Sequence, residues 1–101
     1  MRLFFERYSD EIIPVGKNAE YDKANKILTV FYQTRIDRYL SRTYNFWEVT
    51  DFLEGYNELK NLEIKCDWHG VNIKFDSDDM EEANRLAKFV RECLRDLAKD
   101  L

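Results

Sequence analysis

Glycine and proline are scarce in this chain, with three glycines and one proline among 101 residues. Flexible linkers and low-complexity segments are rich in such residues, so the sequence predicts continuous structure without an internal boundary. One hundred residues is also a common size for one domain. Hydrophobic residues make up 45% of the chain and aromatic residues 15%, enough for a core of its own. We therefore expect a single domain over residues 1–101.

Metal and thiol chemistry have few residues to draw on, because the chain holds two cysteines and one histidine. Zinc sites take at least three protein ligands, and Cys66 and Cys93 stand apart with no CxxC pair. The acidic stretch over residues 76–82 lacks the alternating acids, the glycine and the distal glutamate of an EF-hand loop. We interpret it as the acidic start of a helix. The sequence thus predicts no metal ion and no cofactor.

Long apolar runs and an excess of positive charge are also missing. No run approaches the ~20 residues that span a bilayer, and charged residues occur too early in the chain for a signal peptide. The 16 basic and 20 acidic residues leave a net charge of −4, whereas nucleic-acid-binding domains are usually basic. We expect a cytoplasmic protein with reduced cysteines and no membrane partner.

Residues 61–76 alternate between apolar and polar side chains, which predicts a β-hairpin. We place a two-residue loop at His69-Gly70, where Gly70 can adopt the positive φ that such loops need. A slip by one residue would turn every side chain to the wrong face. The apolar pairs in this register are Trp68 with Val71, Cys66 with Ile73, and Ile64 with Phe75, and the polar pairs are Asp67 with Asn72, Lys65 with Lys74, and Glu63 with Asp76.

Two helices are predicted from helical spacing of apolar residues. The longer covers residues 78–101, with Asp78 and Glu81 as a capping-box-like start. Its apolar stripe consists of Met80, Ala83, Ala87, Val90, Leu94, Leu97 and Leu101, widened by Leu86 and Cys93. The shorter lies within residues 45–59, with Asn45 as the N-cap and Glu48 at the third position. Its apolar face consists of Phe46, Val49, Phe52, Leu53, Tyr56 and Leu59, and Gly55 favours an early end.

The N-terminal half is β-rich. We expect a strand over residues 2–8, a strand over 12–15 whose Pro14 belongs at a sheet edge or at a strand end, and a hairpin over 19–32 with its loop at 22–26. A further strand over 39–44 is predicted from its tyrosine, threonine and arginine content, although a helical turn over 35–42 is an alternative. The fold class is therefore α+β: a two-layer sandwich with a mostly antiparallel sheet of about six strands, order ββββαββα, and one short and one long C-terminal helix on one face.

Cys66 and His69 lie close in sequence, but the hairpin separates them. Cys66 should point into the core, while His69 lies at the exposed tip. A nucleophilic thiolate needs a nearby base and an electropositive setting, and the neighbouring Asp67 would raise the thiol pKa. We therefore predict no catalytic residues. A thiol-dependent enzyme that uses Cys66 is the least favoured of our alternatives.

Arginines and tyrosines interleave over residues 32–44, which is typical of contact surfaces. The candidate binding residues are Tyr32, Arg35, Arg38, Tyr39, Arg42 and Tyr44. Tyrosine and arginine are enriched at protein interfaces, and the same pattern suits single-stranded nucleic acid. We predict a small non-catalytic protein-binding domain (an accessory subunit, adaptor or inhibitor) that acts through this surface and through acidic patches. A nucleic-acid-binding module that uses the three arginines is the alternative, and an exposed edge strand also allows a homodimer.

Overall fold

The computed structural model describes residues 11–32 and 43–99. Its described strands form one antiparallel sheet in the order β1-β2-β3-β5-β4. The strands are β1 (Ile12–Val15), β2 (Ala19–Asp22), β3 (Ile27–Phe31), β4 (Ile64–Cys66) and β5 (Gly70–Lys74). Pro14 lies on β1, an edge strand of this sheet, as predicted. The central position belongs to β3, which pairs with β2 on one side and with β5 on the other.

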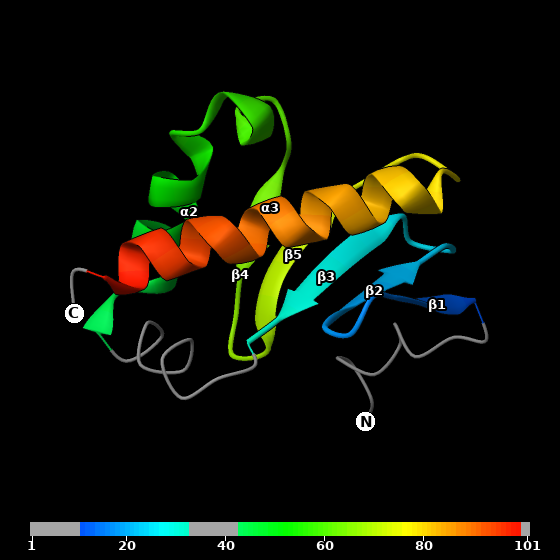
Figure 1. Ribbon diagram of the computed structural model, residues 1–101, viewed down its shortest axis with the longest axis horizontal. Coiled ribbons are helices and arrows are strands. Elements are labelled where there is room, and N and C mark those ends of the chain that lie inside the picture. The colour runs from blue at the N-terminus through cyan, green and yellow to red at the C-terminus, as the bar shows by residue number, and fades with distance from the viewer. Residues whose placement is uncertain (1–10, 33–42, 100–101) are drawn as a thin grey trace.

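The helices are α2 (Phe46–Glu54), the 3-10 turn η2 (Asn57–Leu59) and α3 (Met80–Ala98). The long helix α3 lies across the sheet, and α2 packs against β4 and α3 (Figure 1). The predicted α+β class with helices on one face of an antiparallel sheet is confirmed. The shorter helix ends before Gly55, as expected, and η2 follows as a separate turn. No helix in the described part of the chain has the length and apolar content needed to cross a membrane.

The core lies between α3 and the sheet. Ala83, Ala87, Val90 and Leu94 are buried along α3, and Leu28 is among the buried residues of β3. The small alanines let the helix approach the strands closely. Among the predicted stripe residues, Leu101 lies outside the described residues. The periodic spacing of the stripe therefore identified the face of α3 that meets the sheet.

The loop between β2 and β3 is organised by side chains. Asp22 accepts hydrogen bonds from the Asn25 backbone amide at 3.1 Å and from Asn25 Nδ2 at 2.8 Å. Lys26 then adopts a positive φ of 57°, the one described non-glycine residue that does so. Its Nζ lies 2.9 Å from Asp76 Oδ1. The predicted hairpin over these residues is confirmed, and this ion pair connects it to the segment after β5.

The hairpin of β4 and β5 has the predicted faces but not the predicted register. Ile64 pairs with Ile73 and Cys66 with Val71, which differs from the predicted pairing by two residues. The two-residue loop is Trp68-His69, so the prediction that Trp68 pairs with Val71 in the core is wrong. Gly70 has no positive φ either. It faces Phe31 across the β3–β5 pairing, where a Cβ atom would lie 2.0 Å from the Val30 carbonyl oxygen.

Three further predictions need correction or lie outside the described residues. The N-cap of α3 is Asp79, not Asp78, and its carboxylate accepts from the amides of Glu81 and Glu82. The strand over 2–8 lies outside the described residues, as does most of the strand over 39–44. At the end of that second segment, Thr43 and Tyr44 are not in a strand.

Candidate binding surface

Two tryptophans stand out on the surface. Trp47 has 67% of its surface exposed and Trp68 has 75%, and they are the exposed large hydrophobic side chains of the described residues. Burying such a side chain releases about 1.5–3 kcal/mol, so a protein leaves two of them in water only at a cost. The end of the molecule that carries them is therefore the leading candidate for a contact surface.

Helix α2 directs Trp47 outward. Its N-terminus is held by the Asn45 amide, which donates to Glu48 Oε1 at 2.7 Å. Val49 and Leu53 are the buried residues of this helix, and they anchor its inner face. Trp47 lies on the opposite side, outside the apolar face that the sequence predicts for this helix. The first turn of α2 therefore places the Trp47 indole on the exposed side of the helix.

A tight turn between β4 and β5 presents Trp68. Asp67 Oδ1 accepts hydrogen bonds from the backbone amides of His69 at 2.8 Å and Gly70 at 3.1 Å. Asn72 Nδ2 donates to Asp67 Oδ2 at 3.0 Å and to the Lys65 carbonyl at 3.2 Å. These hydrogen bonds hold the backbone on either side of the loop, and they thereby fix the position of the Trp68 backbone.

The two elements meet through an aromatic contact. The Phe46 and Trp68 rings are 5.1 Å apart at their centroids and nearly perpendicular, at 89°. Such edge-to-face pairs contribute about 0.5–1.5 kcal/mol beyond burial. Phe46 precedes Trp47 at the start of α2, so the three rings belong to one end of the molecule. We call Phe46, Trp47 and Trp68 the aromatic patch.

Negative charge follows the aromatic patch along α2. Asp51 and Glu54 lie four and seven residues after Trp47, which places them on its side of the helix. Both are exposed, as is Glu48. The helix has no lysine or arginine, although Lys65 and His69 are exposed on the neighbouring hairpin. The exposed face of α2 is therefore aromatic at its start and acidic along its length.

The residues predicted to bind from the sequence are only partly described. Tyr32 is 8% exposed and belongs to the core, with its amide donating to the His69 carbonyl at 2.9 Å. Tyr44 is half-buried and packs against the same core. Arg35, Arg38, Tyr39 and Arg42 lie outside the described residues. Tyr32 and Tyr44 thus contribute packing, and the Tyr/Arg surface stays a prediction for the four residues outside the described ranges.

Sequence reasoning missed both tryptophans as surface residues. For Trp47 the signal was present, because the residue lies off the apolar face of its helix. For Trp68 the predicted loop began one residue too late and turned the side chain inward. The cue for the correct loop was Asp67, because an aspartate before a turn accepts hydrogen bonds from backbone amides two and three residues later.

Cys66 and His69 are separated as predicted, with the thiol buried and the imidazole exposed. Burial raises the pKa of the Cys66 thiol, and the hydrogen bond from Thr50 Oγ1 to its sulfur, at 3.3 Å, opposes this in part. Asp67 raises the pKa further. A thiol with a raised pKa is mostly protonated at neutral pH and is a weak nucleophile. Cys93 is likewise free and buried.

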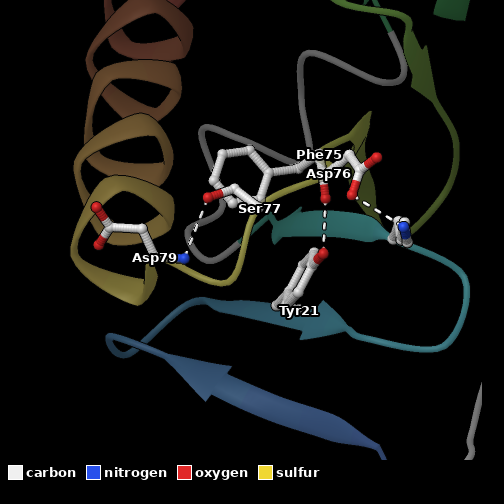
Figure 2. Close-up of polar contacts among 6 residues, drawn as sticks. Tyr21, Phe75, Asp76, Ser77 and Asp79 are labelled. Carbon is white, nitrogen blue, oxygen red and sulfur yellow. Dashed lines mark hydrogen bonds and ion pairs between the residues drawn. The ribbon is translucent and has the colours of Figure 1, made fainter.

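The acidic stretch before α3 has structural partners. Asp76 pairs with Lys26, and Ser77 Oγ accepts from the Asp79 amide at 3.1 Å (Figure 2). In the same view, the Tyr21 hydroxyl donates to the Phe75 carbonyl at 2.7 Å. Within residues 11–32 and 43–99, no three His, Cys, Asp or Glu side chains are grouped to hold a metal ion. The stretch therefore leads into α3, and its Asp76 connects it to the loop between β2 and β3.

Comparison of the chain with protein-family models, with curated proteins and with solved structures found no significant match.

Proposed function

We propose that this chain is a small non-catalytic protein-binding domain, an accessory subunit, adaptor or inhibitor that works in the cytoplasm. It contacts its partner through the aromatic patch and the acidic face of α2. The observation that carries the proposal is the exposure of Trp47 and Trp68. The ring of Trp68 contacts Phe46, the residue before Trp47, so the two tryptophans belong to adjoining elements. Tryptophan is the residue type most enriched among interface hot spots, because its large rigid ring buries much area at little entropic cost.

The charge of α2 indicates the kind of partner. Glu48, Asp51 and Glu54 give its exposed face a negative potential, which steers an oppositely charged surface toward it. A basic protein with an apolar pocket for the indoles matches both features. Such a partner includes proteins whose own basic surface binds nucleic acid. Residues 35–44, with their arginines and tyrosines, lead in sequence directly into the patch and extend the proposed contact surface.

The patch is tested by capture from native lysate with the protein and with the double variant Trp47→Ala, Trp68→Ala. Both side chains are exposed, so the variant should fold, which circular dichroism and a melting curve check. We expect the unmodified protein to capture a protein partner that stays bound after nuclease treatment. The double variant should fail to retain this partner. With the purified partner, each single substitution should weaken binding about 30-fold, as hot-spot tryptophans do. Equal capture by the double variant would contradict the proposal.

The acidic face is tested by its effect on association. Asp51→Asn with Glu54→Gln removes two charges beside the patch, and Glu81→Gln with Glu92→Gln removes two from α3 as the matched control. We expect the first pair to slow association by about two- to tenfold at low salt, since steering acts on the on-rate. The control pair should leave it unchanged. Equal effects of the two pairs would mean that only the net charge matters.

The alternative is a nucleic-acid-binding module that uses Arg35, Arg38 and Arg42. Exposed indoles favour it in one respect, because bases stack on aromatic rings. The acidic face of α2 opposes it. Phosphate contacts make affinity fall steeply with salt, so gel retardation of single-stranded RNA at low salt that disappears with rising salt would support it. Triple alanine substitution of these arginines tests whether either partner contacts them.

A further inference from the structure

A basic cavity lies between the β1–β2 turn and the middle of α3, formed by elements other than those of the aromatic patch. Its volume is about 360 Å³, within the usual size of small-molecule sites. Among the described residues, the ionisable side chains that line it are Lys17, Lys88 and Arg91, and this part of the lining holds no carboxylate. The chain as a whole has 20 acidic and 16 basic residues, so the cavity is a basic region of an acidic protein.

The backbone keeps the cavity in shape. Gly16 turns the chain with a positive φ of 65° and approaches α3 so closely that a Cβ atom would lie 2.9 Å from Asn84 Oδ1. Arg91 Nη1 donates to the Phe31 carbonyl at 3.1 Å, which holds the guanidinium at the wall. The cavity is therefore bounded by a fixed turn, a helix and a strand end, and its charges belong to rigid elements.

The two lysines and an asparagine complete the lining. None of the ion pairs among the described residues uses Lys17 or Lys88. Asn18 also lines the cavity, and its Oδ1 atom is buried without a hydrogen-bond partner in the described structure. A buried acceptor without a partner is costly. A small rotation of the Asn18 side chain on binding would let a donor in the cavity reach this atom and would remove that cost.

We propose that this cavity binds the phosphate group of a small phosphorylated molecule that also carries hydroxyl groups. Lysine and arginine are the side chains that bind phosphate, through charge-assisted hydrogen bonds, and the three cations supply them. A hydroxyl of the same ligand donates to Asn18 Oδ1. A nucleic-acid strand would need cations repeated along a groove, whereas this lining concentrates them in one recess.

The test is a titration of the full chain followed by amide chemical shifts, with inorganic phosphate, ribose 5-phosphate and ribose as probes. We expect saturable shifts at residues 16–19 and 84–91 with both phosphates, tighter binding of ribose 5-phosphate than of phosphate, and no effect of ribose. The absence of saturable shifts up to about 20 mM, a concentration that would reveal even weak binding, would overturn the proposal. Equal affinity for phosphate and ribose 5-phosphate would overturn the role given to Asn18.

Variants locate the site. Lys17→Gln and Lys88→Gln should each weaken ribose 5-phosphate binding about fivefold, the effect expected for a partly exposed charge. Lys65→Gln on β4 removes the same charge at a residue outside the cavity lining and should change nothing. A loss of affinity as large for Lys65→Gln would show that binding follows net charge rather than the cavity. Trp47→Ala with Trp68→Ala should leave phosphate binding intact, so this proposal and the proposed function fail separately.

Discussion

At the scale of single residues, Gly70 has little room for a side chain. It lies where β5 meets β3, and a Cβ atom would lie 2.0 Å from the Val30 carbonyl oxygen and 2.8 Å from Phe31 Cα. Since both obstacles are backbone, the strands would have to separate. We expect Gly70→Ala to lower the free energy of unfolding by about 3 kcal/mol or more, at the upper end of overpacking effects, as measured by denaturant titration.

Gly55 provides the matched control. It ends α2 with a helical φ of −72°, and an added Cβ atom would lie 3.2 Å from its nearest neighbour, the Phe52 carbonyl oxygen. Gly55→Ala should change stability by less than about 1 kcal/mol, because alanine also restricts the unfolded chain. If the two substitutions lowered the free energy of unfolding equally, the close approach of β5 to β3 would not be the reason for a glycine at position 70.

Cys93 makes stability depend on pH in the alkaline range. Burial raises the pKa of its thiol from 9.0 to about 11, with Tyr56 opposing through a hydrogen bond. The folded protein thus holds this proton more tightly than the unfolded chain does. The contribution to stability is complete below pH 9 and is lost as pH rises toward about 11.

The variant Cys93→Ala isolates this contribution. The free energy of unfolding of the wild type minus that of the variant should stay constant up to the unfolded pKa and then decline with rising pH. Cys66, whose pKa is also raised, is common to both proteins and cancels in the comparison. A difference that is flat, or that grows with pH, would contradict the assigned shift. Urea titrations at a series of pH values provide the measurement.

At the scale of elements, the start of α3 distinguishes two adjacent aspartates. Asp79 caps the helix by accepting from the amides of Glu81 and Glu82 at 3.0 Å and 3.2 Å. Asp79→Ala should cost about 1 kcal/mol, as N-cap removal usually does. Asp78→Ala, at the position that the sequence suggested, should cost only a few tenths, about the size of a helix-dipole effect. The reverse order in thermal denaturation would restore the original assignment.

The β4–β5 loop can be checked by fluorescence. Trp47 and Trp68 are the two tryptophans of the chain, and both are exposed in the described structure. Acrylamide should therefore quench the folded protein nearly as well as the unfolded one. With the register predicted from the sequence, Trp68 would be in the core, and about half of the emission would be protected. Trp47→Phe, which leaves Trp68 as the single emitter, makes this distinction direct.

The two registers also show what a pattern can predict. Alternation identified the buried side chains Ile64, Cys66, Val71 and Ile73, because one-residue slips reverse the faces. A two-residue shift preserves every face, so alternation carries no information about it. The choice depends on the side chain of Asp67 and on the contact of Gly70 with β3, and the second of these is tertiary. The wrong choice of N-cap for α3 has a similar cause, because a sequence pattern does not distinguish two adjacent aspartates.

At the scale of the whole molecule, the candidate surface was less predictable than the fold. The apolar faces of both helices follow from their spacing, since each helix must bury one stripe. The aromatic patch depends on how α2 and the β4–β5 turn come together, which brings Phe46 to Trp68. No periodicity encodes that meeting. The basic cavity likewise combines the β1–β2 turn with α3, two segments far apart in the sequence.

The pairing of β3 with β5 is the one long-range strand pairing in the described sheet. The other pairs join strands that follow one another closely in sequence, while Thr29 on β3 and Asn72 on β5 are 43 residues apart and joined by a 2.8 Å hydrogen bond. Closing so long a loop costs entropy before the contacts form. We expect Thr29→Val to slow refolding more than it speeds unfolding in stopped-flow experiments. A larger effect on the unfolding rate would mean that this pairing forms after the transition state.

The described sheet therefore consists of two units whose strands are neighbours in sequence, a three-stranded meander and a hairpin. Their union along β3 and β5 is the step that requires a search through chain conformations. How long this protein takes to fold is then set mainly by how long that search lasts.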